Sequence, residues 1–159
     1  MLRSCMLMLS ILSVALASLP ESGYYDIEEV LVRYAPSSKQ NGSAWDPFGG
    51  APDITLQFLV EEGGDDWVII TTGTKENSGT SASWSSEWEI VFEDPLQESN
   101  SAYLVIKVWD SDTHQSDFMD SGRITLTDLV VGENTVECNY GTRVTFVIDG
   151  PHNQGRVHP

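Results

Sequence analysis

The chain has 159 residues, which suits one domain built around a single core. It carries 8 lysines and arginines against 24 aspartates and glutamates, so its net charge is −16. Such an acidic chain, with scattered basic residues, is unsuited to nucleic-acid binding, and it repels anionic membranes unless a cation intervenes.

The N-terminal residues have the pattern of a secretory signal peptide. Arg3 is followed by an apolar run and by an A-x-A cleavage site at residues 15–17. The run is shorter than the roughly 20 residues that a membrane-spanning helix needs. A buried N-terminal helix is the alternative. We therefore expect a secreted protein with a signal peptide at 1–17, one domain at 18–149 and a loose tail at 150–159.

Alternation of apolar and polar residues with a period of two recurs along the rest of the chain. No window shows a convincing helical period. Short strands separated by turn residues indicate an all-β domain of about eight strands, an antiparallel sandwich or a barrel. The predicted strands lie at 29–34, 54–60, 67–72, 87–92, 104–108, 124–126, 135–138 and 143–148.

Three of the predicted connections are long, at 35–53, 73–86 and 110–122. Long loops on a compact β scaffold are usually functional or disordered. Alternate connections in an antiparallel sheet emerge at the same end, so residues of the first and third long loops can converge. Five aspartates lie in these two loops: Asp46, Asp53, Asp110, Asp112 and Asp117.

The clustered aspartates have two interpretations. Their oxygens can hold Ca²⁺, which takes roughly six to eight oxygen ligands. Alternatively they are solvated turn residues, because aspartate favours turns. An EF-hand is excluded, because Gln115 stands where that loop needs glycine and Ser121 where it needs glutamate.

No catalytic constellation is evident, and we predict that the chain is not an enzyme. Asp120-Ser121-Gly122 is the tripeptide of an aspartic protease, but there is one copy, so only a dimer could supply the second carboxylate. A G-x-S-x-G elbow is absent, and histidines and cysteines do not stand at metal-ligand spacing.

Two further residues bear on an extracellular protein. Cys138 is the one cysteine beyond the predicted signal peptide. It is either a small buried apolar side chain or the partner of a cysteine in another chain. Asn41-Gly42-Ser43 is an N-glycosylation sequon in a polar stretch.

Three segments together resemble the C2 domain, the calcium-dependent phospholipid-binding module. LVIKVWDSDTHQSDFM at 104–119 is similar to the family's strand and third loop, and WDPFGGAPDITLQF at 45–58 to its first loop. SWSSEWEIVF at 83–92 is similar to its tryptophan-containing strand. The resemblance covers about residues 26–149 and implies an eight-stranded antiparallel β-sandwich. One strand precedes loop one, which resembles the type II strand order of secreted members such as the C-terminal domain of perforin.

The resemblance implies a calcium site. Its ligands would be Asp46 and Asp53 in loop one and Asp110, Asp112 and Asp117 in loop three. The family pattern is broken in three places, since loop one is one residue longer than usual, loop three one residue shorter, and a glycine is replaced by Asp120. Asp120 is then either an auxiliary ligand or a solvated turn residue.

The resemblance also implies a membrane-binding surface. Apolar side chains at the loop tips could enter the lipid interface once calcium neutralises the aspartates. The candidates are Trp45, Phe48, Phe118 and Met119. For Trp45, packing beneath the loops is an equal alternative, and Trp84 and Trp88 are expected in the core. The sequence thus predicts a secreted C2-like module that binds phospholipid membranes through calcium. The alternative is an extracellular protein-interaction module in which calcium only stiffens the loops.

Overall fold

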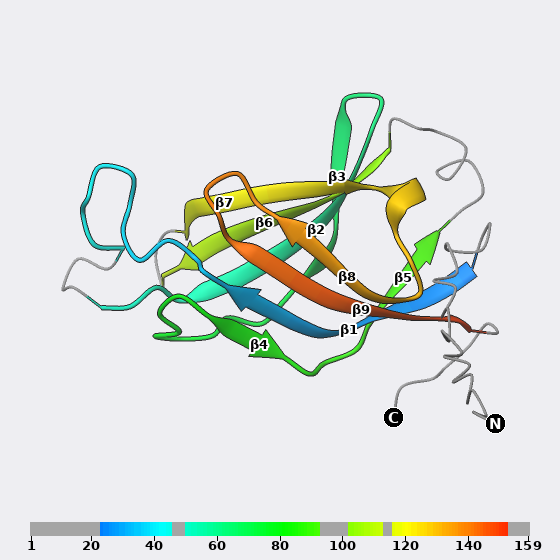
Figure 1. The fold of residues 1–159 in the computed structure, drawn as a ribbon, viewed down its shortest axis with the longest axis horizontal. Coiled ribbons are helices and arrows are strands. Elements are labelled where there is room, and N and C mark those ends of the chain that lie inside the picture. Colours follow the sequence, from blue (N-terminus) through cyan, green and yellow to red (C-terminus); the bar gives the residue numbers. More distant parts are fainter. Residues whose placement is uncertain (1–22, 46–49, 93–101, 113–115, 153–159) are drawn as a thin grey trace, which may run out of the picture.

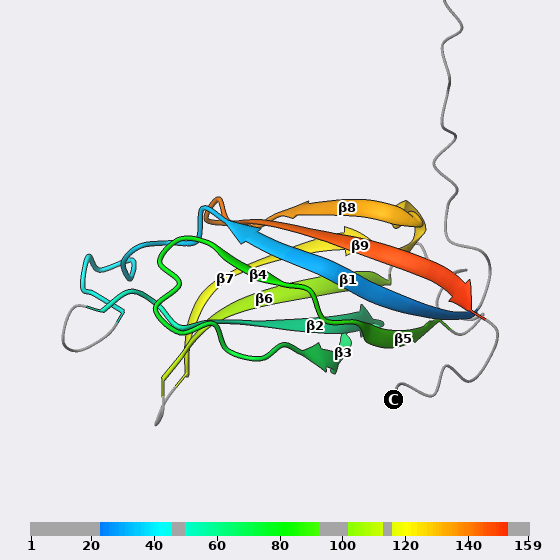
Figure 2. The ribbon, with the colours of Figure 1, turned by 90° about the horizontal axis from the view of Figure 1, so that it is seen from below.

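The structure is a computed structural model that describes residues 23–45, 50–92, 102–112 and 116–152. Within these residues, two antiparallel β-sheets lie face to face (Figures 1 and 2). The predicted all-β sandwich is confirmed, with nine strands in the described part instead of eight. In chain order the elements are β1 (Gly23–Arg33), β2 (Ile54–Glu62), β3 (Asp65–Thr71), β4 (Ala82–Trp84), β5 (Trp88–Phe92), β6 (Tyr103–Ser111), β7 (Ser116–Thr125), the 3-10 helix η1 (Leu126–Asp128), β8 (Gly132–Glu137) and β9 (Arg143–His152).

Each sheet has a simple order. The first runs β4-β1-β9-β8, and β5 also pairs with β1. β1 accommodates both β4 and β5 because β4 pairs with Val30–Val32 and β5 with Gly23–Ile27. The second sheet runs β3-β2-β6-β7. All strand pairs are antiparallel, so the connections gather at the two ends of the sandwich (Figure 1).

The core lies between the two sheets. Along β6 every second side chain is buried, and Leu104, Ile106 and Val108 are fully buried. Phe58 of the second sheet meets Phe146 of the first edge to face, with ring centroids 5.6 Å apart. The alternation seen in the sequence therefore supplies the apolar face of each sheet.

Trp84 and Trp88 belong to the core, as predicted. Trp84 is buried, and its indole N–H donates to the Gly73 carbonyl at 2.7 Å. Trp88 is partly buried against the same core. Trp84, with its ring packed and its N–H satisfied, is not available to contact a lipid surface.

β7 is longer than predicted and takes over part of the expected third loop. It begins at Ser116, because Asp110 and Ser111 of β6 pair with Asp117 and Ser116. These side chains are polar, so the hairpin is extended by backbone pairing that leaves no apolar alternation in the sequence. Phe118 therefore lies within a strand and not at a loop tip.

β1 and β9 also extend beyond their predicted bounds. β1 begins at Gly23, and the bulge between Glu28 and Leu31 changes the phase of its alternation. β9 continues to His152, which pairs with Tyr24, so residues 150–152 belong to a strand and not to a loose tail. The predicted signal peptide and residues 153–159 lie outside the described residues. In the part of the chain that is described, no helix is long and apolar enough to cross a membrane.

Gly122 lets the two sheets approach each other at one edge. A Cβ atom at this position would lie 2.7 Å from Val136 Cγ1 and 2.9 Å from the Glu137 carbonyl oxygen. Both neighbours belong to β8 of the first sheet, whereas Gly122 lies in β7 of the second. Any larger residue would force β7 and β8 apart.

Candidate functional site

The ends of neighbouring strands bring the predicted aspartates together. In the second sheet Ile54 of β2 pairs with Asp110 of β6, and Asp110 pairs with Asp117 of β7. Asp53 immediately precedes β2, and Asp112 immediately follows β6. We refer to Asp53, Asp110, Asp112 and Asp117 as the loop-end aspartates.

Hydrogen bonds fix the orientation of two of them. Asp110 is fully buried, and its Oδ1 accepts the Asp53 N–H at 2.7 Å. Asp53 Oδ1 accepts the Asn77 N–H at 2.6 Å, and the Asp53 carbonyl accepts the Ser111 N–H at 2.8 Å. A buried, oriented carboxylate is not a solvated turn residue, so that interpretation fails for Asp110.

Asp117 is held by a cation that the sequence analysis did not identify. Lys39 Nζ donates to Asp117 Oδ2 at 2.6 Å, across 78 positions of the chain. The hydrogen bond to Asp117, together with the negative charges of Asp117, Asp110 and Asp112, raises the pKa of Lys39. No local sequence pattern could reveal a contact over such a separation.

The chemistry of this donor set fits Ca²⁺. The loop-end aspartates offer oxygen atoms, the hard ligands that calcium prefers, and the Lys39 ammonium stands in for a cation on Asp117. Among the described residues, these aspartates do not form a group of three with ligand oxygens within 4.8 Å of one another. Separation is expected of like charges before a divalent cation draws them together. Asp46, the fifth predicted ligand, lies outside the described residues.

A cavity of about 500 Å³ opens beside this pair. Lys39 and Asp117 line it together with the rings of Trp45, Phe118 and Tyr140. Phe118 is 45% exposed and Tyr140 57%. Phe118 comes from β7 and Tyr140 from the turn between β8 and β9, so two exposed aromatic rings from different elements flank the cavity.

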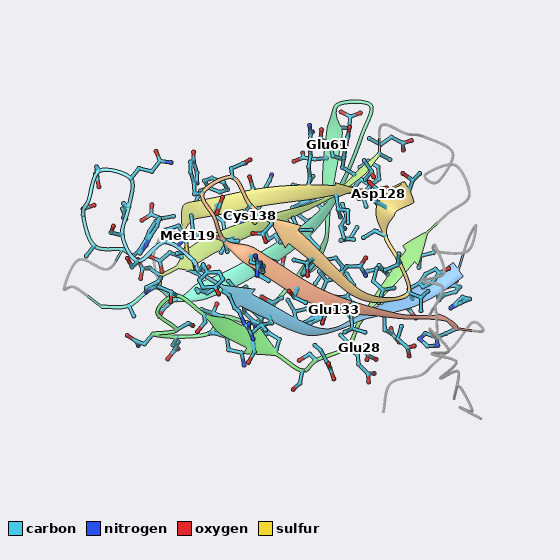
Figure 3. The ribbon with its side chains drawn as sticks, in the orientation of Figure 1. Glu28, Glu61, Met119, Asp128, Glu133 and Cys138 are labelled. Carbon is cyan, nitrogen blue, oxygen red and sulfur yellow. The ribbon has the colours of Figure 1, made fainter. Side chains whose placement is uncertain are left out.

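Two of the predicted membrane-contact residues are buried instead. Trp45 is 5% exposed, and its indole N–H donates to the Pro36 carbonyl at 2.7 Å. Met119 is 3% exposed and lies near the end of the sandwich that carries the loop-end aspartates, which we call the loop end (Figure 3). Because both side chains fill the core, neither can enter a bilayer in this conformation. For Trp45 the structure agrees with the alternative, packing beneath the loops. Phe48 lies outside the described residues.

Asp120 is not a solvated turn residue, because its carboxylate is buried and bonded to backbone N–H groups. It is fully buried, and its Oδ1 accepts the N–H groups of Ser121 at 2.8 Å and Tyr140 at 3.0 Å. Its Oδ2 accepts the Thr142 N–H at 3.1 Å. The carboxylate therefore holds the turn between β8 and β9. With Gly122 at the sheet edge, the Asp-Ser-Gly tripeptide has a structural explanation.

The sandwich is similar to solved C2 domains. The sequence matches no family model and no curated protein. A structure described as that of a C2 domain superposes with a TM-score of 0.52 at 17% identity, over 80% of this chain and 98% of that one. The chain has the fold of a C2 domain.

Larger proteins contain the same fold. For a structure of two C2 domains of extended-synaptotagmin 2 the TM-score is 0.54 at 15% identity, over 92% of this chain and 48% of that one. For human GIVD cytosolic phospholipase A2, in complex with an inhibitor and terbium chloride, the TM-score is 0.55 at 11% identity, over 80% of this chain and 17% of that one. These identities relate the C2 folds and carry no activity over. The closer resemblance to perforin is not confirmed.

The sequon of this C2-fold chain lies beside the cavity. Asn41 is exposed, and its Oδ1 accepts the Ser43 N–H at 3.0 Å and the Ser43 hydroxyl at 2.7 Å. Asn41 and Lys39 both line the cavity. A glycan at Asn41 would therefore stand next to the loop-end aspartates.

Cys138 is buried in the C2 fold at the end of β8. It is 7% exposed, and burial, followed by the charges of Asp120 and Glu137, raises the pKa of its thiol to about 12. The structure agrees with the interpretation of Cys138 as a small buried apolar side chain. A cysteine in another chain could not reach this sulfur without opening the sandwich.

We expect Cys138 to react slowly with an aromatic disulfide reagent at pH 8. The reactive thiolate is about a thousandfold scarcer at a pKa near 12 than at an ordinary thiol pKa, so the native rate should fall by a similar factor. The rate would be followed in a Cys5→Ser variant, where Cys138 is the only thiol, with and without denaturant. Similar rates in both conditions would contradict the burial of Cys138.

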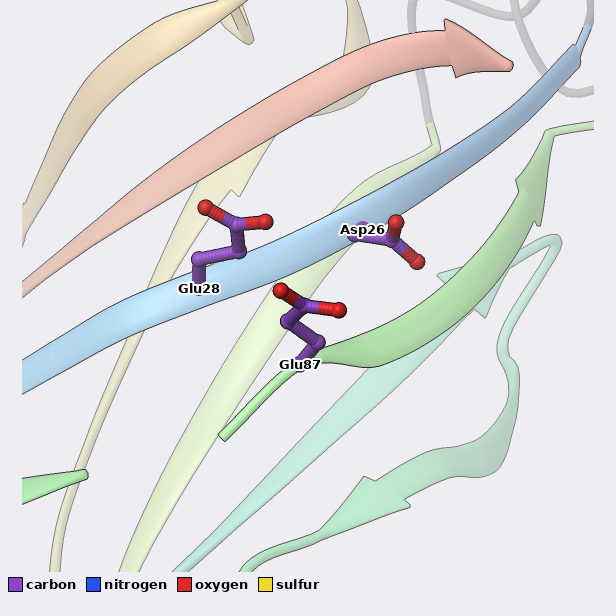
Figure 4. A group of neighbouring side chains, drawn as sticks. All are labelled: Asp26, Glu28 and Glu87. Carbon is purple, nitrogen blue, oxygen red and sulfur yellow. The ribbon is translucent and has the colours of Figure 1, made fainter. Parts of the chain in front are cut away.

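A second group of carboxylates lies along β1 and just before β5, away from the loop-end aspartates. Asp26 and Glu28 of β1 and Glu87, just before β5, have carboxylate oxygens within 4.8 Å of one another (Figure 4). Burial, and then the charges of Asp149 and Glu87, raise the pKa of Glu28. His152 Nε2 lies 3.1 Å from Asp26 Oδ2 and 3.7 Å from Asp149 Oδ2. Sequence reasoning missed this group because Glu87 lies far along the chain from Asp26 and Glu28 and is brought to them only by the pairing of β5 with β1.

Proposed function

We propose that this C2-fold chain binds Ca²⁺ through the loop-end aspartates and, through the ion, phospholipid membranes. The observation that carries the proposal is the register that pairs Asp110 with Asp117 on adjacent strands, together with the hydrogen bond from the Asp53 N–H, just before β2, to the Asp110 carboxylate. The cation already held on Asp117, the Lys39 ammonium, supports the same conclusion. The signal-peptide pattern at residues 1–17 supports a secreted protein, for which weak sites with dissociation constants of about 10⁻⁴–10⁻³ M would suffice.

Charge explains why the ion would be required. The chain carries a net charge of −16, and the loop-end aspartates add to a surface that anionic lipid repels. Bound Ca²⁺ would lower this local negative potential and offer a positive centre to lipid phosphates. Asp110, fully buried, can hold such an ion without exposing its own charge.

Phe118 and Tyr140 are the described residues best placed to contact lipid. Both rings are exposed and flank the cavity next to Asp117. Phe118 is supported from behind by Trp109, with ring centroids 5.6 Å apart and nearly perpendicular. Tyr140, which the sequence did not single out, has the apolar ring and polar tip that favour a membrane interface.

Sedimentation with vesicles tests the proposal. Phosphatidylcholine–phosphatidylserine vesicles should carry the protein down with 1 mM calcium, on the order of the weakest sites considered, and should not do so with a chelator. Phe118→Ser should weaken binding about tenfold, since burying a ring contributes on the order of 1.5 kcal/mol. Trp67→Ser is the matched control, because Trp67 is 42% exposed and lies on β3, away from the loop end.

The position of Asn41 favours a second candidate function, an extracellular protein-interaction module in which calcium only stiffens the loops. A glycan there would obstruct close approach to a bilayer. The sedimentation experiment therefore uses glycosylated protein and Asn41→Gln side by side. Calcium-dependent binding by both supports the membrane module. Calcium binding without vesicle binding by either protein favours the interaction module.

A further inference from the structure

We propose that Lys39 is an internal cation that holds the carboxylate of Asp117 and is displaced when calcium binds, so that it sets the calcium concentration at which the loop end fills. This inference rests on the proposed function, because it treats the loop-end aspartates as calcium ligands. It adds a residue that determines the affinity of the site and that the chain itself supplies.

The contact is short and partly sheltered. Lys39 Nζ and Asp117 Oδ2 are 2.6 Å apart, and the two side chains are 31% and 30% exposed. Charged pairs this close and partly shielded from solvent are weakened less by salt than fully exposed pairs. The other lysine and arginine ion pairs to acidic side chains in the described residues lie elsewhere, joining Lys107 to Asp66, Arg123 to Glu61 and Arg143 to Glu137.

The backbone of Lys39 is fixed by its own turn. Its N–H donates to the Ser43 carbonyl at 2.9 Å, and its carbonyl accepts the Gly42 N–H at 2.8 Å. Gly42 adopts a φ of +80°, which favours glycine, and the Asn41 side chain closes the turn through Ser43. The direction in which the Lys39 side chain leaves the loop is therefore built into the fold.

An aromatic ring supports the ammonium on another side. Lys39 Nζ lies 5.7 Å from the centroid of Trp45, within the range of a cation–π interaction. Trp45 is itself buried and bonded to the Pro36 carbonyl. Lys39 thus has two fixed partners, the Trp45 ring and the Asp117 carboxylate.

Calcium and Lys39 compete for the same carboxylate. Calcium ligand distances are about 2.3–2.6 Å, so an ion on Asp117 would lie within a few ångströms of the ammonium. Two cations so close repel each other, and Lys39 must leave the carboxylate. Calcium binding is then an exchange of one cation for another, and the lost Lys39–Asp117 contact weakens the apparent affinity.

Calorimetric titration with calcium chloride tests this. Lys39→Met keeps the apolar stem of the side chain and removes the competing charge. We expect its dissociation constant for calcium to be about tenfold lower than that of the unmodified protein. Lys107→Met is the matched control, because it removes the same charge from a pair with Asp66 on the outer sheet face. It should change the dissociation constant by less than about twofold.

A second readout follows Lys39 directly in the unmodified protein. The chain has three lysines, Lys39, Lys75 and Lys107, so ¹³C-lysine labelling gives three side-chain signals to assign. Calcium should move the Lys39 Cε signal as the ammonium leaves the Asp117 carboxylate beside the Trp45 ring, and leave the Lys107 signal in place. This measurement does not depend on any variant folding correctly.

The outcomes separate this inference from the proposed function. If the unmodified protein binds calcium but Lys39→Met binds no more tightly than Lys107→Met, and the Lys39 signal is unmoved, Lys39 is not a competitor and the calcium site stands. If calcium titration produces heat with Lys39→Met but not with the unmodified protein, the result supports the competition and shows that it is strong. Absence of heat in both proteins at several millimolar calcium, above the weakest dissociation constant considered, about 10⁻³ M, overturns both ideas.

Discussion

Replacing Asp110 and Asp112 together by asparagine is expected to abolish calcium binding at millimolar concentrations. Asp110 lies at the centre of the loop-end aspartates, with Asp53 on one side and Asp117 on the other. Removal of two carboxylate charges should weaken calcium binding by at least about a hundredfold. The fold should survive, because asparagine keeps an oxygen that can accept the Asp53 N–H.

Calorimetry and thermal unfolding measure this effect independently. Calcium at ten times its dissociation constant should stabilise the unmodified protein by about 1.4 kcal/mol, which is roughly 3–6 °C in melting temperature for a chain of this size. The double variant should show neither heat nor stabilisation. Asp65→Asn/Asp66→Asn makes the same charge change on exposed residues of β3 and should behave like the unmodified protein. Equal loss in both double variants would point to general charge rather than to a site.

Replacing Asp120 by alanine is expected to lower the free energy of unfolding by about 3–6 kcal/mol, because a buried donor left without a partner costs roughly 1–3 kcal/mol and three N–H groups, one buried and two partly buried, would lose theirs. The carboxylate accepts the N–H groups of Ser121, Tyr140 and Thr142. Loss of all three acceptances would undo the turn between β8 and β9. The effect approaches the whole stability of many domains, about 5–15 kcal/mol.

Urea unfolding of Asp120→Ala, Asp120→Asn and Asp66→Ala measures how much the Asp120 carboxylate contributes to the free energy of unfolding. Asp120→Asn keeps one acceptor oxygen and presents an amide group that cannot accept, so its loss should be intermediate. Asp66→Ala removes an exposed carboxylate paired with Lys107 and should cost less than about 1 kcal/mol. A loss below about 1 kcal/mol for Asp120→Ala would show that the turn is held by other contacts.

The regular strands of the sandwich were predictable because their side chains alternate. On β6, every second side chain faces the core of the sandwich, as the spacing of Leu104, Ile106 and Val108 indicates. The start of β7 was not predictable, because the residues from Ser116 to Asp117 pair through their backbone and carry polar side chains. A strand that extends beyond the core leaves no hydrophobic period to read.

The candidate site also contains residues that could be predicted from the sequence and residues that could not. Asp53, Asp110 and Asp117 are brought together as expected, because strand ends that meet at one edge follow from the topology. Lys39 and Tyr140 could not be found, because their roles depend on contacts across many residues. Trp45 shows the limit of residue type as a guide, since a tryptophan in a long loop is here part of the core.

The group formed by Asp26, Glu28 and Glu87 lies along the first part of β1 and just before β5, away from the loop-end aspartates. Without calcium the loop-end aspartates and this second group both carry negative charge. Calcium on the loop end alone would give the molecule an electric dipole along its longest axis. An anionic surface would then exert a torque that turns the loop end toward it, within a screening length of about 8 Å at physiological salt. The sandwich would then approach the surface with its loop end foremost before any side chain contacts lipid. Added salt would abolish this alignment at a lower concentration than it would need to displace the calcium ion.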